Sequence, residues 1–268
     1  MSFPSTRLPN LASFGEAVPH ARLLSNGRYL AVVTGAGTGY AALNGVQLTS
    51  WSPDRVEDGD GLFVYLQDLD DGLTWSVGSA PLGAAGRCDA AYRPGVMKLT
   101  NTRRGVESEM EICVAPDADA ELRRIRVRNV GAVRRRIAIT VYAGVVLHHA
   151  AAHASHPAFS KLFVETAVDK ERGVLRAHRR PRGPGDPAMH LATGFFGPGT
   201  LEWETDRTRF IGRGRSLATA RALETDAPLS GSTGSVLDPV VAMRRTVVLE
   251  PGDAGAWSWV VCCADTAD

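Results

Sequence analysis

Arg136-Ile-Ala-Ile-Thr-Val-Tyr-Ala-Gly-Val-Val-Leu147 is a long apolar stretch that predicts a strand near the middle of the chain. It leads, through a short segment rich in alanine and histidine, into His156-Pro-Ala-Phe-Ser-Lys-Leu-Phe-Val-Glu-Thr166. This second stretch mixes an imidazole, an aromatic ring, a hydroxyl and an ammonium group, and polar loops rich in proline and glycine follow it. A β-rich domain presents a polar surface at such a junction, so we expect a functional surface here.

Outward from this junction, several segments alternate apolar and polar residues, as a half-buried strand requires. Val106–Val114 places its apolar residues on one face, and Leu122–Asn129 alternates apolar residues with arginines. Turn signals such as Asn26-Gly27 and Asn44-Gly45 recur along the chain. Further strands are predicted at residues 21–24, 29–34, 46–51, 62–67, 161–166, 174–178, 189–193, 240–249 and 257–262. This density of strands predicts an all-β fold, a large antiparallel sandwich.

The composition narrows the classes of partner. The 30 lysines and arginines stand against 29 aspartates and glutamates, a net charge of +1. A protein that binds nucleic acid through its phosphates needs an excess of positive charge, so no nucleic-acid partner is expected. Arginine clusters such as Arg123-Arg124, Arg134-Arg135-Arg136 and Arg179-Arg180 are interpreted as solvated strand edges and turns.

Cysteine usage and hydropathy predict the compartment. The four cysteines include no CxxC pair, and Cys113 and Cys262 lie in apolar strand-like runs, where a free thiol behaves as a small hydrophobic group. Disulfides are therefore not expected, which favours a reducing compartment. No apolar run approaches the length of a membrane helix, and the first residues lack a signal-peptide core. We expect a soluble, cytoplasmic chain that does not insert into a membrane.

Four histidines between the two central stretches, His148, His149, His153 and His156, suggest a metal site at first sight. No carboxylate or cysteine lies near them in the sequence, and alanines flank them, so we interpret them as polar loop residues. No metal and no cofactor is expected. The sequence holds neither a GxSxG nor an HExxH motif, and no catalytic residue is assigned.

Other polar and aromatic residues are candidates for contact with a ligand. Arg213 and Arg215 lie in a dense charged turn, where they could hold carboxylates or hydroxyls, or simply pair with neighbouring acids. Tyr40 and Trp51 flank glycine-marked turns, where one of them could stack on a sugar ring. The alternative for both aromatic residues is a role as core anchors of the sandwich.

Several segments together resemble glycoside hydrolase family 94. They are Leu24-Ser-Asn-Gly-Arg-Tyr29, Gly37-Thr-Gly-Tyr40, Trp51, Phe63-Val-Tyr-Leu-Gln-Asp68, the stretch 156–166, Glu204-Thr-Asp-Arg207, Phe210-Ile-Gly-Arg-Gly-Arg215 and Pro228-Leu-Ser-Gly-Ser-Thr-Gly-Ser-Val-Leu-Asp-Pro239. They occur in the same order as in that family, over nearly the whole chain from about residue 20. The chain most resembles the phosphorylase-like C-terminal region of cyclic β-1,2-glucan synthases, with cellobiose and chitobiose phosphorylases as more distant relatives.

The resemblance implies a β-supersandwich of the galactose-mutarotase type at residues 21–268, after an N-terminal arm at 1–20. In the family a helical linker and an (α/α)₆ barrel follow this domain, and the barrel carries the catalytic acid and the phosphate site. The chain ends at Asp268, after the last predicted strand, so we expect the barrel to be absent from it. The resemblance then implies a non-catalytic domain that supports dimerisation, walls the active site and can contact a β-glucan or glucose oligosaccharide.

In the family's phosphorylases, the loop after the long strand crosses a homodimer and caps the partner's active site. The matching positions here are His156 to Lys161, so the resemblance makes His156, Phe159, Ser160 and Lys161 sugar-proximal. As a strand, this segment would place Phe159, Lys161 and Phe163 on one face, which would make Phe163 a core residue.

Two other functions stay open at this point. One is an aldose epimerase-like enzyme in which the His148–His156 group and Glu165 act as acid and base. The other is a purely structural oligomerisation domain. Turnover of an aldohexose would favour the first alternative over a binding or structural role.

Overall fold

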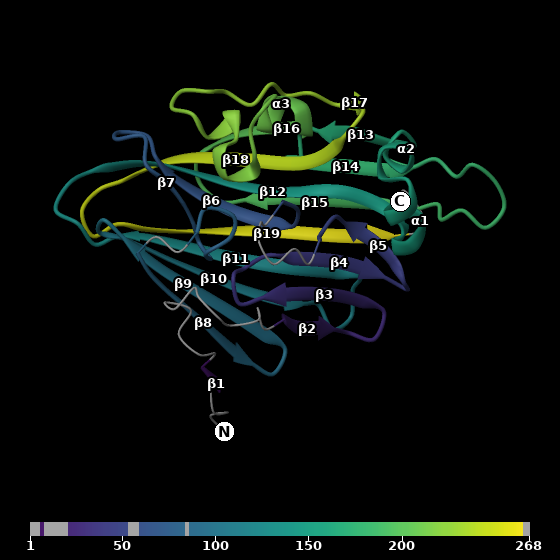
Figure 1. Ribbon diagram of the computed structural model, residues 1–268. Coiled ribbons are helices and arrows are strands. Elements are labelled where there is room, and N and C mark those ends of the chain that lie inside the picture. Colours follow the sequence, from purple (N-terminus) through teal and green to yellow (C-terminus); the bar gives the residue numbers. More distant parts are fainter. Residues whose placement is uncertain (1–5, 8–20, 53–58, 84–85, 265–268) are drawn as a thin grey trace.

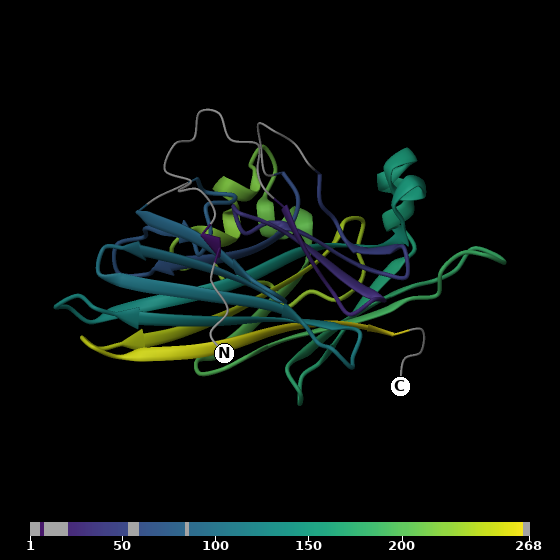
Figure 2. The same cartoon turned by 90° about the horizontal axis from the view of Figure 1, so that it is seen from below.

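Two large antiparallel sheets make up the computed structural model, which describes residues 6–7, 21–52, 59–83 and 86–264 (Figures 1 and 2). The ten-stranded sheet has, in spatial order, β1 (Thr6–Arg7), β8 (Arg87–Arg93), β9 (Val96–Arg103), β10 (Val106–Val114), β11 (Ala120–Asn129), β19 (Ala254–Ala264), β15 (His190–Phe196), β14 (Val174–Arg179), β13 (Val164–Asp169) and β17 (Gly234–Ser235). The predicted all-β antiparallel sandwich is confirmed.

The nine-stranded sheet is built around β12. It has, in spatial order, β16 (Thr200–Asp206), β18 (Pro239–Leu249), β12 (Arg135–His149), β5 (Val46–Thr49), β4 (Gly39–Leu43), β3 (Tyr29–Thr34) and β2 (Ala21–Ser25). A further strand, β6 (Leu62–Asp68), pairs with residues 137–143 of β12 and with β7 (Thr74–Ser76). Beyond that point β12 pairs with β5, after a bulge between Val145 and His148.

Both faces of β12 are covered, which explains its uninterrupted apolar sequence. Every residue from 137 to 148 is buried. Its odd-numbered residues, from Ile137 to Leu147, belong to the main core between the two sheets. Its opposite face carries Tyr142, which packs with Phe63, Tyr65 and Phe210 in a second apolar cluster. A strand buried on both faces has no polar face to alternate with the apolar one.

The second cluster exists because segment 207–229 folds back over the nine-stranded sheet (Figure 1). This segment contains α3 (Arg207–Ile211) and two short 3₁₀ helices, η1 (Leu217–Thr219) and η2 (Arg221–Leu223). The helices α1 (Ala150–Ser155) and α2 (Pro157–Lys161) follow β12 and lie at one end of the sandwich (Figure 1). No helix in the described ranges is long and apolar enough to cross a membrane.

The predicted strand at 161–166 is wrong at its start, because residues 157–161 form α2 and β13 begins only at Val164. Proline is well tolerated in the first turn of a helix, and Pro157 stands there, followed by the bond from Ser160 N to His156 O at 2.9 Å. Gly39 begins β4, after a turn at residues 35–36. A side chain at Gly39 would lie 1.8 Å from the Val32 carbonyl oxygen, so only glycine fits that position.

The interpretation of the arginine clusters as solvated is wrong for Arg179, which is 2% exposed, and for Arg123. The Arg123 side chain is fully buried, 3.2 Å from the Glu121 carboxylate, and its guanidinium lies over the Trp259 ring. Arg124 is exposed, as predicted. Because β11 alternates its faces, adjacent arginines point to opposite sides of the sheet, and a buried acid on the same face accommodates the inward one. Of the predicted arm, only β1 is described, and it pairs with β8.

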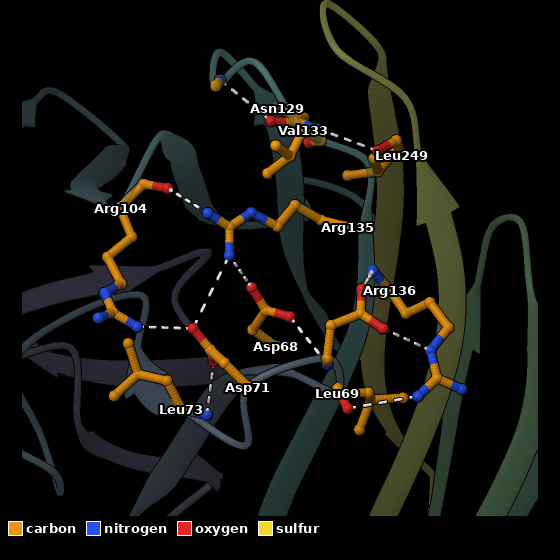
Figure 3. Close-up of polar contacts among 12 residues, drawn as sticks. Asp68, Leu69, Asp71, Leu73, Arg104, Asn129, Val133, Arg135, Arg136 and Leu249 are labelled. Atoms are coloured by element: carbon orange, nitrogen blue, oxygen red, sulfur yellow. Dashed lines mark hydrogen bonds and ion pairs between the residues drawn. The ribbon is translucent and has the colours of Figure 1, made fainter.

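An ion-pair network holds the beginning of β12 (Figure 3). Asp68, at the end of β6 and 2% exposed, accepts a short hydrogen bond from Arg135 Nη1. Arg135 Nη2 also donates to the Arg104 carbonyl at 3.3 Å, and Arg104 pairs with Asp71 at 2.6 Å. The next residue, Arg136, bonds Asp70 at 2.9 Å. These contacts join the β6–β7 turn to the strand that organises the sheet.

Another anchor holds the loop that precedes β18. Glu204 of β16 is 2% exposed, and its carboxylate accepts from Ser230 Oγ at 2.6 Å, from Ser232 Oγ, and from the backbone N–H groups of Thr205 and Asp206 at 2.9 and 3.0 Å. Burial raises the pKa of Glu204, but the serine hydroxyls and backbone N–H groups outweigh it, so the pKa lies below the usual range.

Replacing Asp68→Asn should lower the free energy of unfolding by about 2–3 kcal/mol, because half-buried Arg135 would lose its nearest and most buried carboxylate and keep only Asp71, 3.8 Å away, as an ionic partner. Glu250→Gln is the matched control, because Glu250 pairs with Arg134 at the exposed surface and should cost less than about 1 kcal/mol. Urea unfolding measures both variants. Equal stabilities of the two variants would contradict the role given to Asp68.

Glu204 should make the stability depend on pH. Its pKa is lowered in the folded chain, so its contribution is complete above the unfolded pKa of about 4.3 and is lost as the pH falls through the folded pKa. The difference in unfolding free energy between the wild type and Glu204→Gln should therefore shrink from pH 6 to pH 3. Glu107→Gln, on the exposed face of β10, serves as control. A difference that stays constant with pH would refute this account.

Candidate functional site

Three of the segments that carry the family resemblance meet beyond the end of β12. Lys161 of α2 places Nζ 2.6 Å from Asp238 Oδ1, and Arg207 of α3 places Nη1 3.6 Å from Asp238 Oδ2. The Arg207 backbone N–H also donates to the Asp238 carbonyl at 3.0 Å. One carboxylate therefore joins residues that lie far apart in the sequence, at positions 161, 207 and 238.

Helix α2 has an exposed aromatic side and a buried polar side. Phe159 is 51% exposed, whereas Ser160 is 4% exposed. The Ser160 carbonyl accepts from Arg179 Nη1 at 2.8 Å, and Arg179 is itself buried. Ser160 therefore faces inward and anchors the helix, while Phe159 faces outward.

The exposed ring of Phe159 is held in place by its neighbours. It lies edge-on to the Phe163 ring, with centroids 5.2 Å apart, and the Arg182 guanidinium lies over both rings. The predicted common strand face for Phe159 and Phe163 is wrong. The two residues meet because the chain turns helically, which brings side chains four apart together. Asp186 accepts from Arg182 Nε at 2.8 Å, and this bond lowers the pKa of Asp186 to about 2.

The histidines are dispersed rather than gathered. His148 is buried in β12, where Nδ1 accepts from the His149 backbone N–H at 2.8 Å. His153 is in α1, and His156 is an exposed residue between the two helices. Burial, and then nearby positive charge, lowers the pKa of His148 and of His153. Among the residues that the structure describes, no group of three or more histidine, cysteine or acidic side chains could hold a metal ion.

Glu165, the base of the epimerase-like alternative, has other partners. Its carboxylate lies 3.0 Å from Arg180 Nε and 3.6 Å from His178 Nε2. His178 in turn stacks on His190 of the neighbouring strand. The structure therefore joins Glu165 to the histidine of β14, and among the described residues no ion pair or hydrogen bond links it to the His148–His156 group.

Tyr40 and Trp51 form a stacked pair, with ring centroids 5.7 Å apart and planes 18° from parallel. Both side chains are half-buried, and neither belongs to the buried core. Ser50, the residue before Trp51, directs its hydroxyl to Asp60 Oδ1 at 3.3 Å. Its backbone N–H donates to the Gly144 carbonyl of β12 at 2.9 Å.

The two arginines of the charged turn differ in their contacts. Arg215 makes an ion pair with Glu224 at 2.5 Å, as the alternative of pairing with neighbouring acids predicts. Arg213 is exposed. Both lie after α3, in the segment that covers the nine-stranded sheet.

Several residues of this region were not predicted from the sequence as site residues, namely Tyr142, Arg207, Asp238 and Asp60. Tyr142 lies within an apolar run, and no sequence spacing links the others to it or to one another.

A separate open groove on the ten-stranded sheet is lined by residues such as Thr100, Glu109, Arg126 and Ala256, with no aromatic ring in its lining. It therefore lacks the flat apolar surface on which a sugar ring stacks.

Comparison with known proteins identifies the relatives of this chain. Residues 13–268 match the family described as glycosyl hydrolase 94, supersandwich domain. The cyclic β-(1,2)-glucan synthase NdvB of Rhizobium meliloti (strain 1021) is 39% identical over 249 residues, which are 91% of this chain and 9% of that protein. The chain thus spans less than a tenth of the length of this relative.

Solved structures support the fold alone. A bacterial glucoamylase complexed with acarbose aligns over 98% of this chain and 36% of its own, with a TM-score of 0.57 at 7% identity. A candidate aldose 1-epimerase from Escherichia coli aligns over 91% of this chain and 99% of its own, with a TM-score of 0.53 at 8% identity. By its sequence match, the chain belongs to the glycosyl hydrolase 94 supersandwich-domain family.

Proposed function

We propose that this chain is the non-catalytic β-supersandwich of an enzyme that acts on a β-glucan or a glucose oligosaccharide. It walls the active site of such an enzyme and supports a homodimer. Family membership supports the association with a carbohydrate enzyme, and the glucan synthase relative supports glucan as the substrate class. The observation that carries the proposal is the outward-facing, ordered ring of Phe159 on α2.

Helix α2 is suited to the role of a cap because it is ordered before any ligand arrives. The Lys161–Asp238 ion pair and the Arg179–Ser160 bond hold the helix, and Arg182 holds the Phe159 ring. A preordered aromatic ring loses little conformational entropy on binding and offers a flat apolar face to a pyranose ring. Exposed His156 precedes the helix and can donate to or accept from a hydroxyl.

The surroundings of α2 also suit contact with another protein surface. Leu162 is 44% exposed and Leu237 is 77% exposed, and they are next in sequence to the two members of the Lys161–Asp238 ion pair. Interface cores combine apolar and aromatic side chains with few charges, and Phe159 extends this apolar surface. A second copy of the chain, or the catalytic part of a partner subunit, is the occupant that we propose.

The thiols support the proposal about the compartment. Cys113 and Cys262 are free, and burial raises the pKa of both, which disfavours the reactive thiolate. Free, unreactive thiols support the proposal of a reducing compartment such as the cytoplasm.

Phe159→Ala, in a full-length enzyme that contains this domain, should raise KM or lower kcat by roughly 5–10-fold, because an aromatic contact worth about 1–1.5 kcal/mol is lost. Tm should change little, since the ring is half exposed. Leu23→Ala, at an exposed leucine on β2, is the control and should leave the kinetics unchanged. A destabilised Phe159→Ala enzyme with normal kinetics per folded molecule would mean that the ring is structural.

A further inference from the structure

Three buried polar atoms on β12, α1 and α3 have no hydrogen-bond partner within the described part of the chain. They are Tyr142 Oη on β12, His153 Nδ1 on α1 and Arg207 Nε on α3. The Tyr142 side chain is fully buried. A buried polar group without a partner costs stability, and such groups in native proteins are few. Other described side chains, such as Trp75 and Arg123, also have unpartnered atoms, but these three are distinguished by the charged groups that they share.

The same two carboxylates connect these three groups. Asp238 pairs with Lys161 and Arg207, and its charge also acts on Tyr142 and His153. The negative charge of Asp60 also acts electrostatically on the three side chains Tyr142, His153 and Arg207. The Tyr142 hydroxyl lies beside the Arg207 guanidinium, but the two make no hydrogen bond of normal geometry. The groups thus form one polar cluster, which we call the Tyr142 cluster: Tyr142, His153, Lys161, Arg207, Asp238 and Asp60.

The Tyr142 cluster has a balanced charge and a mixed set of donors and acceptors. Two cations, Lys161 and Arg207, face two anions, Asp60 and Asp238. This balance gives little attraction for phosphate or for a polyanion. A neutral molecule with several hydroxyls can donate to the carboxylates and accept from the guanidinium and the ammonium.

The chain leads from Asp60 of this cluster, through its contact with Ser50, to an aromatic pair. Ser50, which contacts Asp60, directly precedes Trp51, and Trp51 stacks on Tyr40. Binding sites for small polar ligands combine apolar and aromatic walls with a few directed polar groups. A sugar ring has both matching surfaces, an apolar face of C–H groups and an edge of hydroxyls.

We propose that the Tyr142 cluster binds the hydroxyl edge of a neutral hexopyranose unit, with the Tyr40–Trp51 pair beside it as the stacking surface. The class of ligand rests on the proposed function. The site is separate from the Phe159 ring, although Lys161 belongs to both regions. These three atoms are enclosed in the free chain, so binding opens the cluster, and the sugar hydroxyls then satisfy Tyr142 Oη, His153 Nδ1 and Arg207 Nε.

Tyr65 provides a matched comparison for Tyr142. Both tyrosines are fully buried in the second apolar cluster, and both contact Phe210. The Tyr65 hydroxyl donates to the Leu217 carbonyl at 3.3 Å, whereas the Tyr142 hydroxyl has no partner. Removing the Tyr65 hydroxyl therefore removes a structural bond, and removing the Tyr142 hydroxyl removes only the group that we assign to the ligand.

The test titrates the chain with glucose and with sophorose, the β-1,2-linked glucose disaccharide, by calorimetry and tryptophan fluorescence. We expect binding to the wild type, with Kd raised about tenfold in Tyr142→Phe, the loss of one directed hydrogen bond. In Tyr65→Phe, Kd should remain unchanged and Tm should fall. Tm of Tyr142→Phe should equal or exceed that of the wild type. Arg207→Lys, which keeps the charge beside Asp238, is a second variant that should also weaken binding.

Three outcomes would overturn the proposal. One is the absence of sugar binding by the wild type up to high millimolar concentration. Another is an unchanged Kd together with a lowered Tm in Tyr142→Phe, which would mean that ordered water or an internal bond satisfies the hydroxyl. The third is binding of inorganic phosphate in preference to sugar. The test measures equilibrium binding to this chain, whereas the Phe159 test measures kinetics of an assembled enzyme, so either can fail alone.

Discussion

The burial of β12 on both faces is the constraint on which the rest of the structure depends. Its one face lies in the core between the sheets, and its other face lies under segment 207–229. Water is excluded from both sides, so the strand must be apolar along almost its whole length. The few polar groups that it carries, such as the Tyr142 hydroxyl and the His148 imidazole, then lie where a partner must be supplied.

The covering of the outer face also creates the functional end of the domain. Helix α3 follows β16, α1 and α2 follow β12, and Asp238 immediately precedes β18. These three strands are neighbours in the order β16, β18, β12, so their ends bring α2, α3 and Asp238 together. Pairing between strands thus places residues 161, 207 and 238 within ion-pair distance. Glu204 and its two serines fix the loop that leads to Asp238.

The sequence predicted most of the sheet structure, because alternation in β10 and β11 and turn pairs such as Asn26-Gly27 are local signals. It did not predict α1 and α2, since helices of five or six residues have too few turns to show a periodic pattern. It also placed Arg123 in solvent, because a basic pair does not reveal which of its members faces a buried acid.

The candidate site was predicted in part. The stretch 156–161 was identified, and Phe159 is exposed there, whereas Ser160 is buried. Tyr142, Arg207 and Asp238 were missed as a group, because only strand pairing brings them together. Such long-range proximity has no counterpart in local spacing. The aromatic pair Tyr40 and Trp51 was predicted as two separate residues, and the stacking between them is a result of the fold.

The central claim is that this domain meets sugar at the end of β12. Two-dimensional amide NMR of the chain, titrated with a β-1,2-linked glucose oligosaccharide, tests this most directly. The account predicts shift changes confined to the Trp51 indole, α1, α2 and the residues around Arg207 and Asp238. Shift changes centred instead on the groove of the ten-stranded sheet, around Thr100, Glu109 and Arg126, would contradict it.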